Sequence, residues 1–320
     1  MITNFSTNLP LKLKNTKRVL ELQKSNAPSP QDQNARMLVA GIQMSVPITG
    51  GNVGRMCAEV GKAMALFPGI EMIVFSELAA HGPLLTSMVE DPAADEQKFQ
   101  ELAARHKIWL LPGSMFVKRE GKIFNHSIVI DPTGRIIGRY DKLFPFQPFE
   151  KGVEGGSHLF AFDVPGVGRF GIAICYDIWF PEVMRALSSD GVEVLLHPVL
   201  TGTTDRSAEL SIAKATSAMF QCYVVDVNGL DAGGIGKSLV TDPTGRAVYQ
   251  AGQTPEIFPI MLDLGLVRQC RQSGANSLGQ VLKSWRDRSI SFSYEDRNRG
   301  NSYLKSVSYT HLTLPTKRIV

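Results

Sequence analysis

Three residues that could cooperate in covalent catalysis each stand at the end of a predicted strand: Glu77, Lys142 and Cys175. Glu77 follows the run Ile-Val-Phe-Ser, Lys142 follows Gly-Arg-Tyr-Asp, and Cys175 follows Phe-Gly-Ile-Ala-Ile. Short apolar runs with β-branched residues are typical of buried strands. Because ligands bind at the carboxyl ends of the strands in an open α/β sheet, these side chains could share one site.

Together the three groups could activate a thiol nucleophile without a histidine. A free thiol has a pKa of about 8.5, so only a few per cent is ionised at neutral pH. The Glu77 carboxylate could take the proton during attack, and the Lys142 ammonium could favour the thiolate and stabilise an oxyanion. Taken singly, each residue also has a structural explanation, as a helix cap, a solvated cation or a buried hydrophobe. Their shared position favours catalysis, whereas His197, at the end of another buried strand, is interpreted as structural.

The order of predicted elements indicates two halves, each with alternating strands and helices followed by a hairpin. The hairpins surround the same Asp-Pro-Thr-Gly turn, in residues 127–135 and 238–246. This order requires a mixed sheet in each half with helices on one face. Two such sheets stacked face to face would form helix–sheet–sheet–helix layers. The other predicted strands are 37–44, 71–76, 108–111, 170–174, 192–196 and 223–228, and the predicted helices are 52–67, 92–106, 181–188 and 205–220.

The composition is that of a soluble globular protein. Hydrophobic residues make up 43% of the 320 residues and charged residues 20%. Residues 1–36 carry six Lys or Arg against two acidic residues, so much of the net charge of +4 lies there. The near-neutral body argues against a nucleic-acid or membrane-surface partner. With scattered cysteines, no apolar run of about 18 residues and no signal-peptide pattern, we expect a cytoplasmic protein.

Three motifs in this order resemble those of the nitrilase, or carbon–nitrogen hydrolase, superfamily, whose hallmark is a Glu–Lys–Cys triad. They occupy residues 73–78, 138–144 and 171–182. The resemblance extends over about 37–267. It implies the α/β fold of that superfamily, a four-layer αββα sandwich with two mixed β-sheets, which agrees with the two halves described above.

The resemblance also implies a role for each site residue. Glu77 would deprotonate Cys175, which would attack the substrate and form a thioester, and Lys142 and the backbone N–H of Tyr176 would hold the oxyanion. Glu150, eight residues after Lys142, would hydrogen-bond the lysine and help to place the substrate. Neither a metal nor an organic cofactor is implied.

The substrate is predicted from the residues around the nucleophile. Nitrilases usually have Trp-Glu after the cysteine, whereas Tyr-Asp follows here, as in the amidase branches of the superfamily. Phe146, Trp179 and Thr201 could line the pocket. The leading hypothesis is a hydrolase that converts a small amide to a carboxylic acid and ammonia. Nitrilase and N-carbamoyl-amine hydrolase activity remain alternatives, as does a catalytically inactive binding or scaffold protein of the same fold.

The resemblance implies a homodimer, and the candidate contact helices are 181–188 and 205–220. The second is rich in small and apolar residues, more than one buried face requires. The domain prediction has four parts. It comprises a disordered N-terminal extension at 1–36, the hydrolase domain at 37–290, a C-terminal arm at 291–306, and a tail at 307–320 that resembles a translated sequencing adapter and is expected to be non-native.

Overall fold

The computed structural model describes residues 35–292. The predicted tail 307–320, nearly all of the predicted extension 1–36 and most of the predicted arm 291–306 therefore lie outside the described residues. The first strand, β1, begins at Arg36. Within 35–292, no helix has the length and apolar character needed to cross a bilayer.

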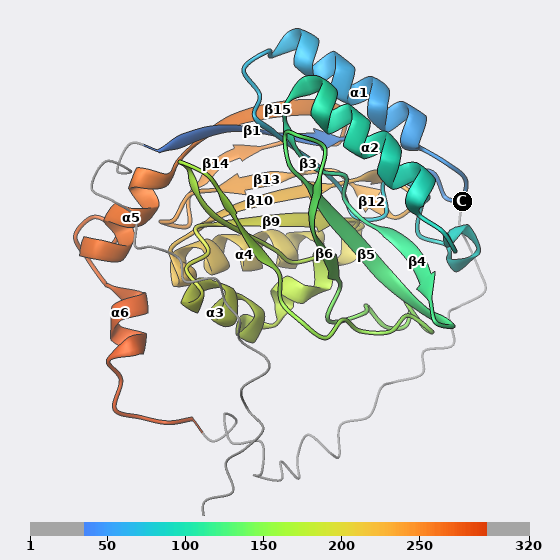
Figure 1. Ribbon diagram of the computed structural model, residues 1–320. Helices are drawn as coiled ribbons and strands as arrows, with labels where there is room; N and C mark the ends of the chain where they lie inside the picture. The colour runs from blue at the N-terminus through green and yellow to red at the C-terminus, as the bar shows by residue number, and fades with distance from the viewer. Residues whose placement is uncertain (1–34, 293–320) are drawn as a thin grey trace, which may run out of the picture.

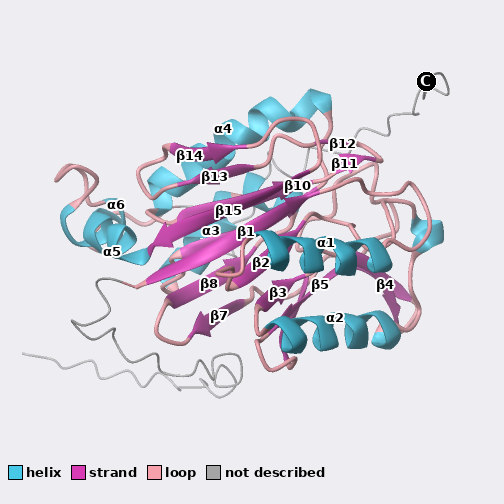
Figure 2. Cartoon of the chain, turned by 90° about the horizontal axis from the view of Figure 1, so that it is seen from above, coloured by secondary structure: helices cyan, strands magenta, loops and turns pink. Residues whose placement is uncertain are grey.

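Two sheets lie face to face between two pairs of helices, which confirms the predicted αββα sandwich (Figure 1). The helices α1 (Val53–Leu66) and α2 (Ala93–His106) cover the outer face of the first sheet (Figure 2). The helices α3 (Pro181–Ser189) and α4 (Thr203–Phe220) cover the outer face of the second. One apolar core fills the space between the sheets, and a further core lies under each helix pair.

Each sheet is mixed, as predicted. The first sheet runs, in spatial order, through β15 (Glu256–Asp263), β1 (Arg36–Gln43), β2 (Met72–Phe75), β3 (Trp109–Leu111), β5 (Lys122–Ile130) and β4 (Met115–Arg119), with β6 (Ile136–Asp141) also paired to β5. The second runs through β14 (Ala247–Gln250), β13 (Leu239–Thr241), β10 (Tyr223–Asn228), β9 (Val194–Val199), β8 (Gly168–Ile172) and β7 (Ala161–Val164). The remaining elements are the short hairpin β11 (Leu230–Asp231) and β12 (Gly234–Ile235), the 3-10 helix η2 (Leu85–Ser87), and the helices α5 (Leu264–Ser273) and α6 (Val281–Arg286).

The strand β15 was not predicted, and it joins the sheet of the opposite half. It pairs antiparallel with β1 along the whole length of both strands. Its sequence carries Pro259, which a strand tolerates at a sheet edge, where β15 lies. The contact with β1 is close, because a Cβ at Gly41 would fall 2.1 Å from the Phe258 ring.

The two predicted hairpins are confirmed, and their turns use the same side-chain contacts. The Oδ1 atom of Asp131 accepts hydrogen bonds from the backbone N–H groups of Thr133 and Arg135, between β5 and β6. Asp242 makes the equivalent contacts between β13 and β14. Each aspartate thus accepts hydrogen bonds from the backbone N–H groups of the turn that follows it, which explains why the same sequence recurs in both halves.

Candidate active site

The structure places the three predicted catalytic residues at the ends of strands from different sheets. Glu77 follows β2 and Lys142 follows β6 in the first sheet, whereas Cys175 comes shortly after β8 in the second. All three are buried, with 3%, 1% and 8% of each residue exposed. The site therefore lies where the two sheets face each other.

Lys142 lies between two carboxylates. Its Nζ donates to Glu77 Oε1 at 2.8 Å and to Glu150 Oε2 at 2.7 Å, so the structure brings Glu150 to the lysine as the resemblance implied. Burial alone would lower the pKa of Lys142, but the charges of Glu77, Cys175 and Glu150 raise it well above its ordinary value. The ammonium is therefore charged at neutral pH, as an oxyanion partner must be.

Asn125, on β5, was not among the predicted site residues. Its Nδ2 donates to Glu77 Oε1 and to Glu150 Oε1, both at 2.8 Å, so it links the same two carboxylates as Lys142. Its backbone carbonyl also accepts the N–H of Lys142 at 2.9 Å. The available signal in the sequence was a run of three polar residues, Asn125, His126 and Ser127, within a strand whose other inner residues are apolar.

The backbone turns sharply at the nucleophile. The predicted strand 170–174 ends at Ile172, and Cys175 begins the 3-10 helix η3 (Cys175–Trp179). Cys175 has a φ of 45°, in the left-handed region that non-glycine residues adopt only when their surroundings hold them there. Because the first N–H groups of a helix lack intrahelical partners, the N–H of Tyr176 is suited to the predicted oxyanion role.

A neighbouring carboxylate supports this turn. Asp177 accepts hydrogen bonds from Tyr140 Oη at 2.7 Å and from the N–H groups of Ile174 and Phe144. Burial raises the pKa of Asp177 to about 6, against the effect of Lys142 and of these donors. Asp177 therefore joins the turn at the nucleophile to the segment that follows Lys142.

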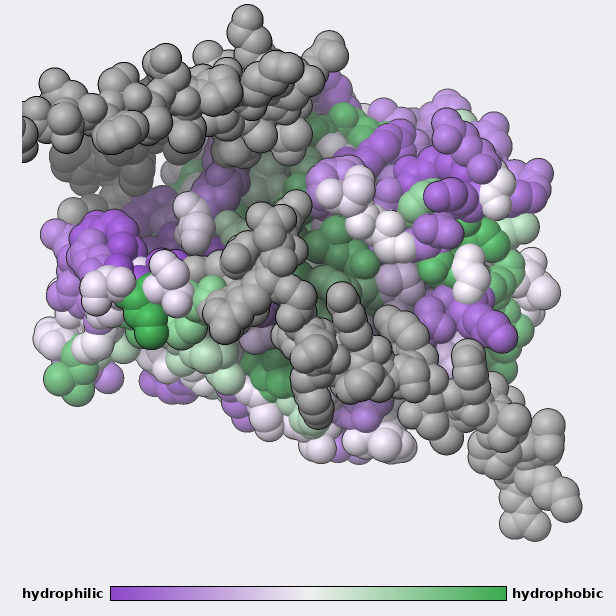
Figure 3. All heavy atoms as spheres, turned by 90° about the horizontal axis from the view of Figure 1, so that it is seen from below, coloured by the Kyte–Doolittle hydropathy of each residue, from purple (hydrophilic) through white to green (hydrophobic). Residues whose placement is uncertain are grey.

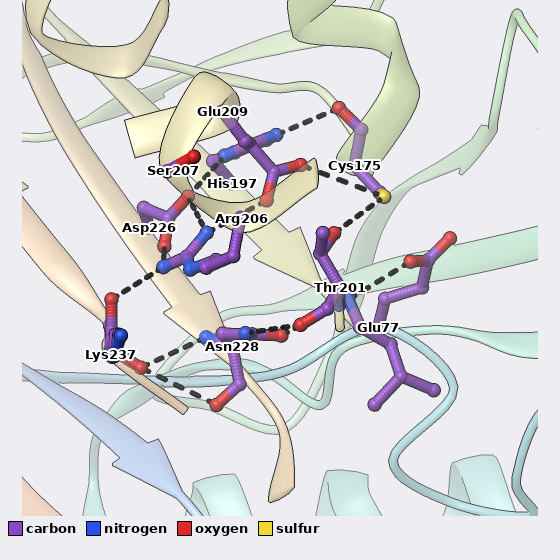
Figure 4. A network of polar contacts seen from close by, with 12 residues as sticks. Glu77, Cys175, His197, Thr201, Arg206, Ser207, Glu209, Asp226, Asn228 and Lys237 are labelled. Atoms are coloured by element: carbon purple, nitrogen blue, oxygen red, sulfur yellow. Dashed lines mark hydrogen bonds and ion pairs between the residues drawn. The ribbon is translucent and has the colours of Figure 1, made fainter. Parts of the chain in front are cut away.

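The Cys175 sulfur is not hydrogen-bonded to Glu77, the residue that the resemblance implies as its base. Its hydrogen-bonding partners among the described residues are Thr201 Oγ1 at 3.5 Å and Glu209 Oε1 at 3.8 Å (Figure 4). Glu77 is held elsewhere, because Oε1 accepts from Lys142 and Asn125, and Oε2 accepts from the Leu200 N–H at 3.1 Å. Glu77 and Lys142 still lie close enough for their charges to act on the thiol.

His197 holds the backbone of Cys175, which agrees with its structural interpretation. Its Nε2 lies 3.0 Å from the Cys175 carbonyl oxygen, and its Nδ1 lies 2.9 Å from Asp226 Oδ2. A carbonyl and a carboxylate only accept hydrogen bonds, so both ring nitrogens must donate and the imidazole is protonated. This agrees with its pKa, which burial would lower but Asp226 raises overall.

The predicted pocket residues lie near Cys175 or against the ring of its neighbour Tyr176. Thr201 contacts the sulfur, as described above. Phe146 and Trp179 both pack on the ring of Tyr176, with centroid distances of 5.0 and 5.9 Å. The N–H of Phe146 also donates to Glu150 Oε2 at 2.5 Å, which ties this aromatic cluster to the partner of Lys142.

Comparisons with known proteins agree with this arrangement. A family model described as carbon-nitrogen hydrolase matches residues 33–272. A formamidase from Bacillus cereus is 26% identical over 251 residues, which cover 71% of this chain and 75% of the relative. A deaminated glutathione amidase from Yersinia enterocolitica is 29% identical over 180 residues, or 50% of this chain. Hydrolase C26A3.11 of Schizosaccharomyces pombe is 24% identical over 58% of this chain. The chain spans 62% of the length of each of these last two relatives.

Solved structures share the fold. Nit3 of Saccharomyces cerevisiae, a member of branch 10 of the nitrilase superfamily, aligns with a TM-score of 0.68 and 25% identity over 74% of this chain and 94% of its own. A carbon-nitrogen hydrolase from Helicobacter pylori aligns with a TM-score of 0.71 and 21% identity, over 83% of this chain and all of its own.

Proposed function

Because the chain belongs to the carbon–nitrogen hydrolase family, we propose that it hydrolyses a small amide to a carboxylic acid and ammonia through a Cys175 thioester. The observation that carries the proposal is the buried Lys142, held between Glu77 and Glu150 beside a strained cysteine. A scaffold protein would gain little from this arrangement, since replacing buried ion pairs by apolar residues is often neutral or stabilising.

In the proposed mechanism, Glu77 takes the proton of Cys175 while the sulfur attacks the amide carbon. Glu77 Oε2, which accepts only the Leu200 N–H among the described hydrogen bonds, has a lone pair for this proton. The oxyanion is stabilised by Lys142 and by the Tyr176 N–H. Glu77 then protonates the leaving nitrogen, which departs as ammonia and leaves the thioester. Finally Glu77 deprotonates a water that attacks the thioester, and the thiol regains its proton as the acid leaves.

A small neutral amide suits the site best. Cys175, Glu77 and Lys142 are each at most 8% exposed, which favours a small acyl group. The guanidinium of Arg206 binds the same Glu209 that contacts the thiol, and it is already bonded to Glu209 and Asp226, so it is not free to bind a substrate carboxylate. The match to a formamidase supports the same choice.

Ammonia release from a panel of substrates tests the proposal. We expect turnover of small aliphatic amides, with kcat/KM falling as the acyl group grows or gains a carboxylate. Activity confined to nitriles or to N-carbamoyl amines would replace the amidase proposal by one of those alternatives. No turnover of any of the three classes, by folded protein with an unmodified Cys175, would favour a binding or scaffold role.

We also propose that the protein forms a homodimer or a larger homo-oligomer. A cytoplasmic location and the absence of nucleic-acid partners are proposals as well. The buried side of α4, which includes Ala213, Thr216 and Phe220, packs on its own subunit. Met219, on the same helix, is 43% exposed. Seen from below (Figure 3), hydrophobic patches also lie among hydrophilic ones on the surface. A second copy could cover such residues along α3 and α4.

Light scattering on the full chain tests this assembly, and we expect the mass of a dimer or a larger homo-oligomer. Replacing Met219 by Glu should shift the protein towards the monomer, because a charge would be buried at the contact. Replacing Met261 by Glu, at an exposed position on β15, is the matched control. A wild-type protein that is active and monomeric at all concentrations would contradict the proposal.

A further inference from the structure

A second carboxylate, Glu209, approaches the nucleophile from α4. Its Oε1 lies 3.8 Å from Cys175 Sγ, and only 1% of the residue is exposed. It is the carboxylate hydrogen-bonded to the sulfur among the described residues (Figure 4). Glu77, in contrast, accepts hydrogen bonds from Lys142 and Asn125. A thiol is a hydrogen-bond donor only weakly, so a carboxylate is the acceptor best suited to hold it.

Glu209 is fixed in place by a buried charge network. Arg206 Nη1 donates to Glu209 Oε2 at 2.8 Å and also to Asp226 Oδ2 at 3.1 Å, and a second donor, Nη2, contacts Asp226 Oδ1. Asp226 in turn accepts from protonated His197. These four side chains come from α4, β9 and β10.

The charges of this network balance when Glu209 is ionised. Arg206 and protonated His197 contribute two positive charges, and Asp226 and Glu209 two negative charges. Protonating Glu209 would leave one cation uncompensated in a buried place, which is costly. Burial and Asp226 raise the pKa of Glu209, and Arg206 opposes them, so the group is ionised but is a stronger proton acceptor than an exposed carboxylate.

The charges of three side chains therefore act on the Cys175 thiol, and each side chain comes from a different element. Glu77 comes from the end of β2, Lys142 from the end of β6 and Glu209 from α4. Burial and Glu77 raise the pKa of the Cys175 thiol, Lys142 lowers it, and Glu209 raises it further. The resting thiol thus keeps its proton. Glu209 is the carboxylate that the sulfur contacts, whereas Glu77 acts on the thiol through its charge.

We propose that Glu209 is a positioning residue that accepts the hydrogen of the resting Cys175 thiol and keeps the thiol protonated and turned away from Glu77. The hydrogen must then pass to Glu77 when the substrate enters. The inference rests on the proposed function only in taking Cys175 as the nucleophile of that reaction.

Alkylation of Cys175 tests the inference without a substrate. The rate constant for iodoacetamide labelling of Cys175 in the full chain would be followed by peptide mass spectrometry from roughly pH 6 to pH 10, on both sides of the pKa of a free thiol. The variant is Glu209→Gln, which keeps the shape of the side chain and an acceptor for Arg206. The matched control is Glu193→Gln. Glu193 is also a buried carboxylate bonded to an arginine, Arg268, and its side chain has no hydrogen bond to a site residue within the described part of the chain.

In the wild type we expect the midpoint of the labelling profile above about 8.5, the pKa of a free thiol. In Glu209→Gln it should fall by about one pH unit, giving about tenfold more thiolate at neutral pH. Because a less basic thiolate is less nucleophilic (Brønsted coefficient about 0.4–0.5), labelling should be about threefold faster. Glu193→Gln should match the wild type.

Three results would overturn the inference. One is a Glu209→Gln profile that coincides with the wild type, which would leave Glu209 as a partner of Arg206 alone. Another is a midpoint that rises in the variant, which would mean that Glu209 donates to a thiolate. The third, which needs no variant, is a wild-type midpoint below about 8.5. Failure of the amide panel with a shifted profile would instead overturn the proposed function.

Discussion

Cys175→Ala is expected to lower kcat/KM by a factor of about 10⁴ or more, because it removes the atom that forms the thioester. Glu77→Gln and Lys142→Ala should each cost nearly as much. Residues that act as one unit are not additive, so combining two of these substitutions should add little to either alone. Steady-state ammonia release, with folding checked by circular dichroism, measures all of these variants.

The other three cysteines provide the control. Cys57, Cys222 and Cys270 are free thiols outside the site, and Cys222 belongs to the core beneath α3 and α4. Burial raises the pKa of Cys222 to about 12, so it should react slowly. Replacing each by Ala should leave turnover largely intact. If a thiol reagent inactivated the protein by labelling Cys222 instead of Cys175, the nucleophile assignment would be wrong.

Lys142→Met should lower the free energy of unfolding by about 3–5 kcal/mol, the usual cost of leaving buried charges without their partner. The loss is large because one ammonium serves two carboxylates, Glu77 and Glu150. Urea denaturation at constant pH measures it. Adding Glu150→Gln to Lys142→Met should recover part of the stability, since one unpaired charge is then removed.

An exposed pair of the same chemistry is the matched control for this stability effect. Lys118 Nζ lies 2.9 Å from Glu90 Oε1, with 37% and 73% of these side chains exposed. Lys118→Met should therefore change stability by less than about 1 kcal/mol. If Lys142→Met and Lys118→Met proved equally mild, water would have to reach the pair at Lys142, and the site would not be closed.

Most of the fold follows from hydrophobic periodicity, since the buried strands and the amphipathic helices fall where the sequence predicts them. The strands that were missed explain the limits of that signal. β15 contains Pro259 and is only partly buried, and β4 and β7 are short strands at sheet edges. Edge strands contact one neighbour, so their sequences are less constrained, and their partners are chosen by the tertiary fold.

The structure brings the predicted residues together, and their catalytic roles stay a prediction. The contact between Lys142 and Glu150 was expected, whereas the contacts of Cys175 with Thr201 and Glu209 were not. Strand ends and motif spacing identify Glu77, Lys142, Glu150 and Cys175. The positive φ of Cys175 and the rotation of Glu77 towards Lys142 depend on packing between the sheets, which local sequence does not encode. Glu209 was missed because a single glutamate on an amphipathic helix usually faces water. Only the position of α4 against η3 turns it towards the sulfur.

The pairing of β15 with β1 also constrains how the protein can be made. Until the ribosome has added residues up to Asp263, β1 lacks its antiparallel neighbour and presents an unpaired edge to other chains. Gln43, at the end of β1, accepts a hydrogen bond from the backbone N–H of Ser238. This partner is likewise absent until much later in synthesis. Such long-range pairings slow folding and favour aggregation of incomplete chains. We therefore expect that the half carrying Glu77 and Lys142 cannot be expressed as a separate folded fragment, and that the active site forms only late in synthesis.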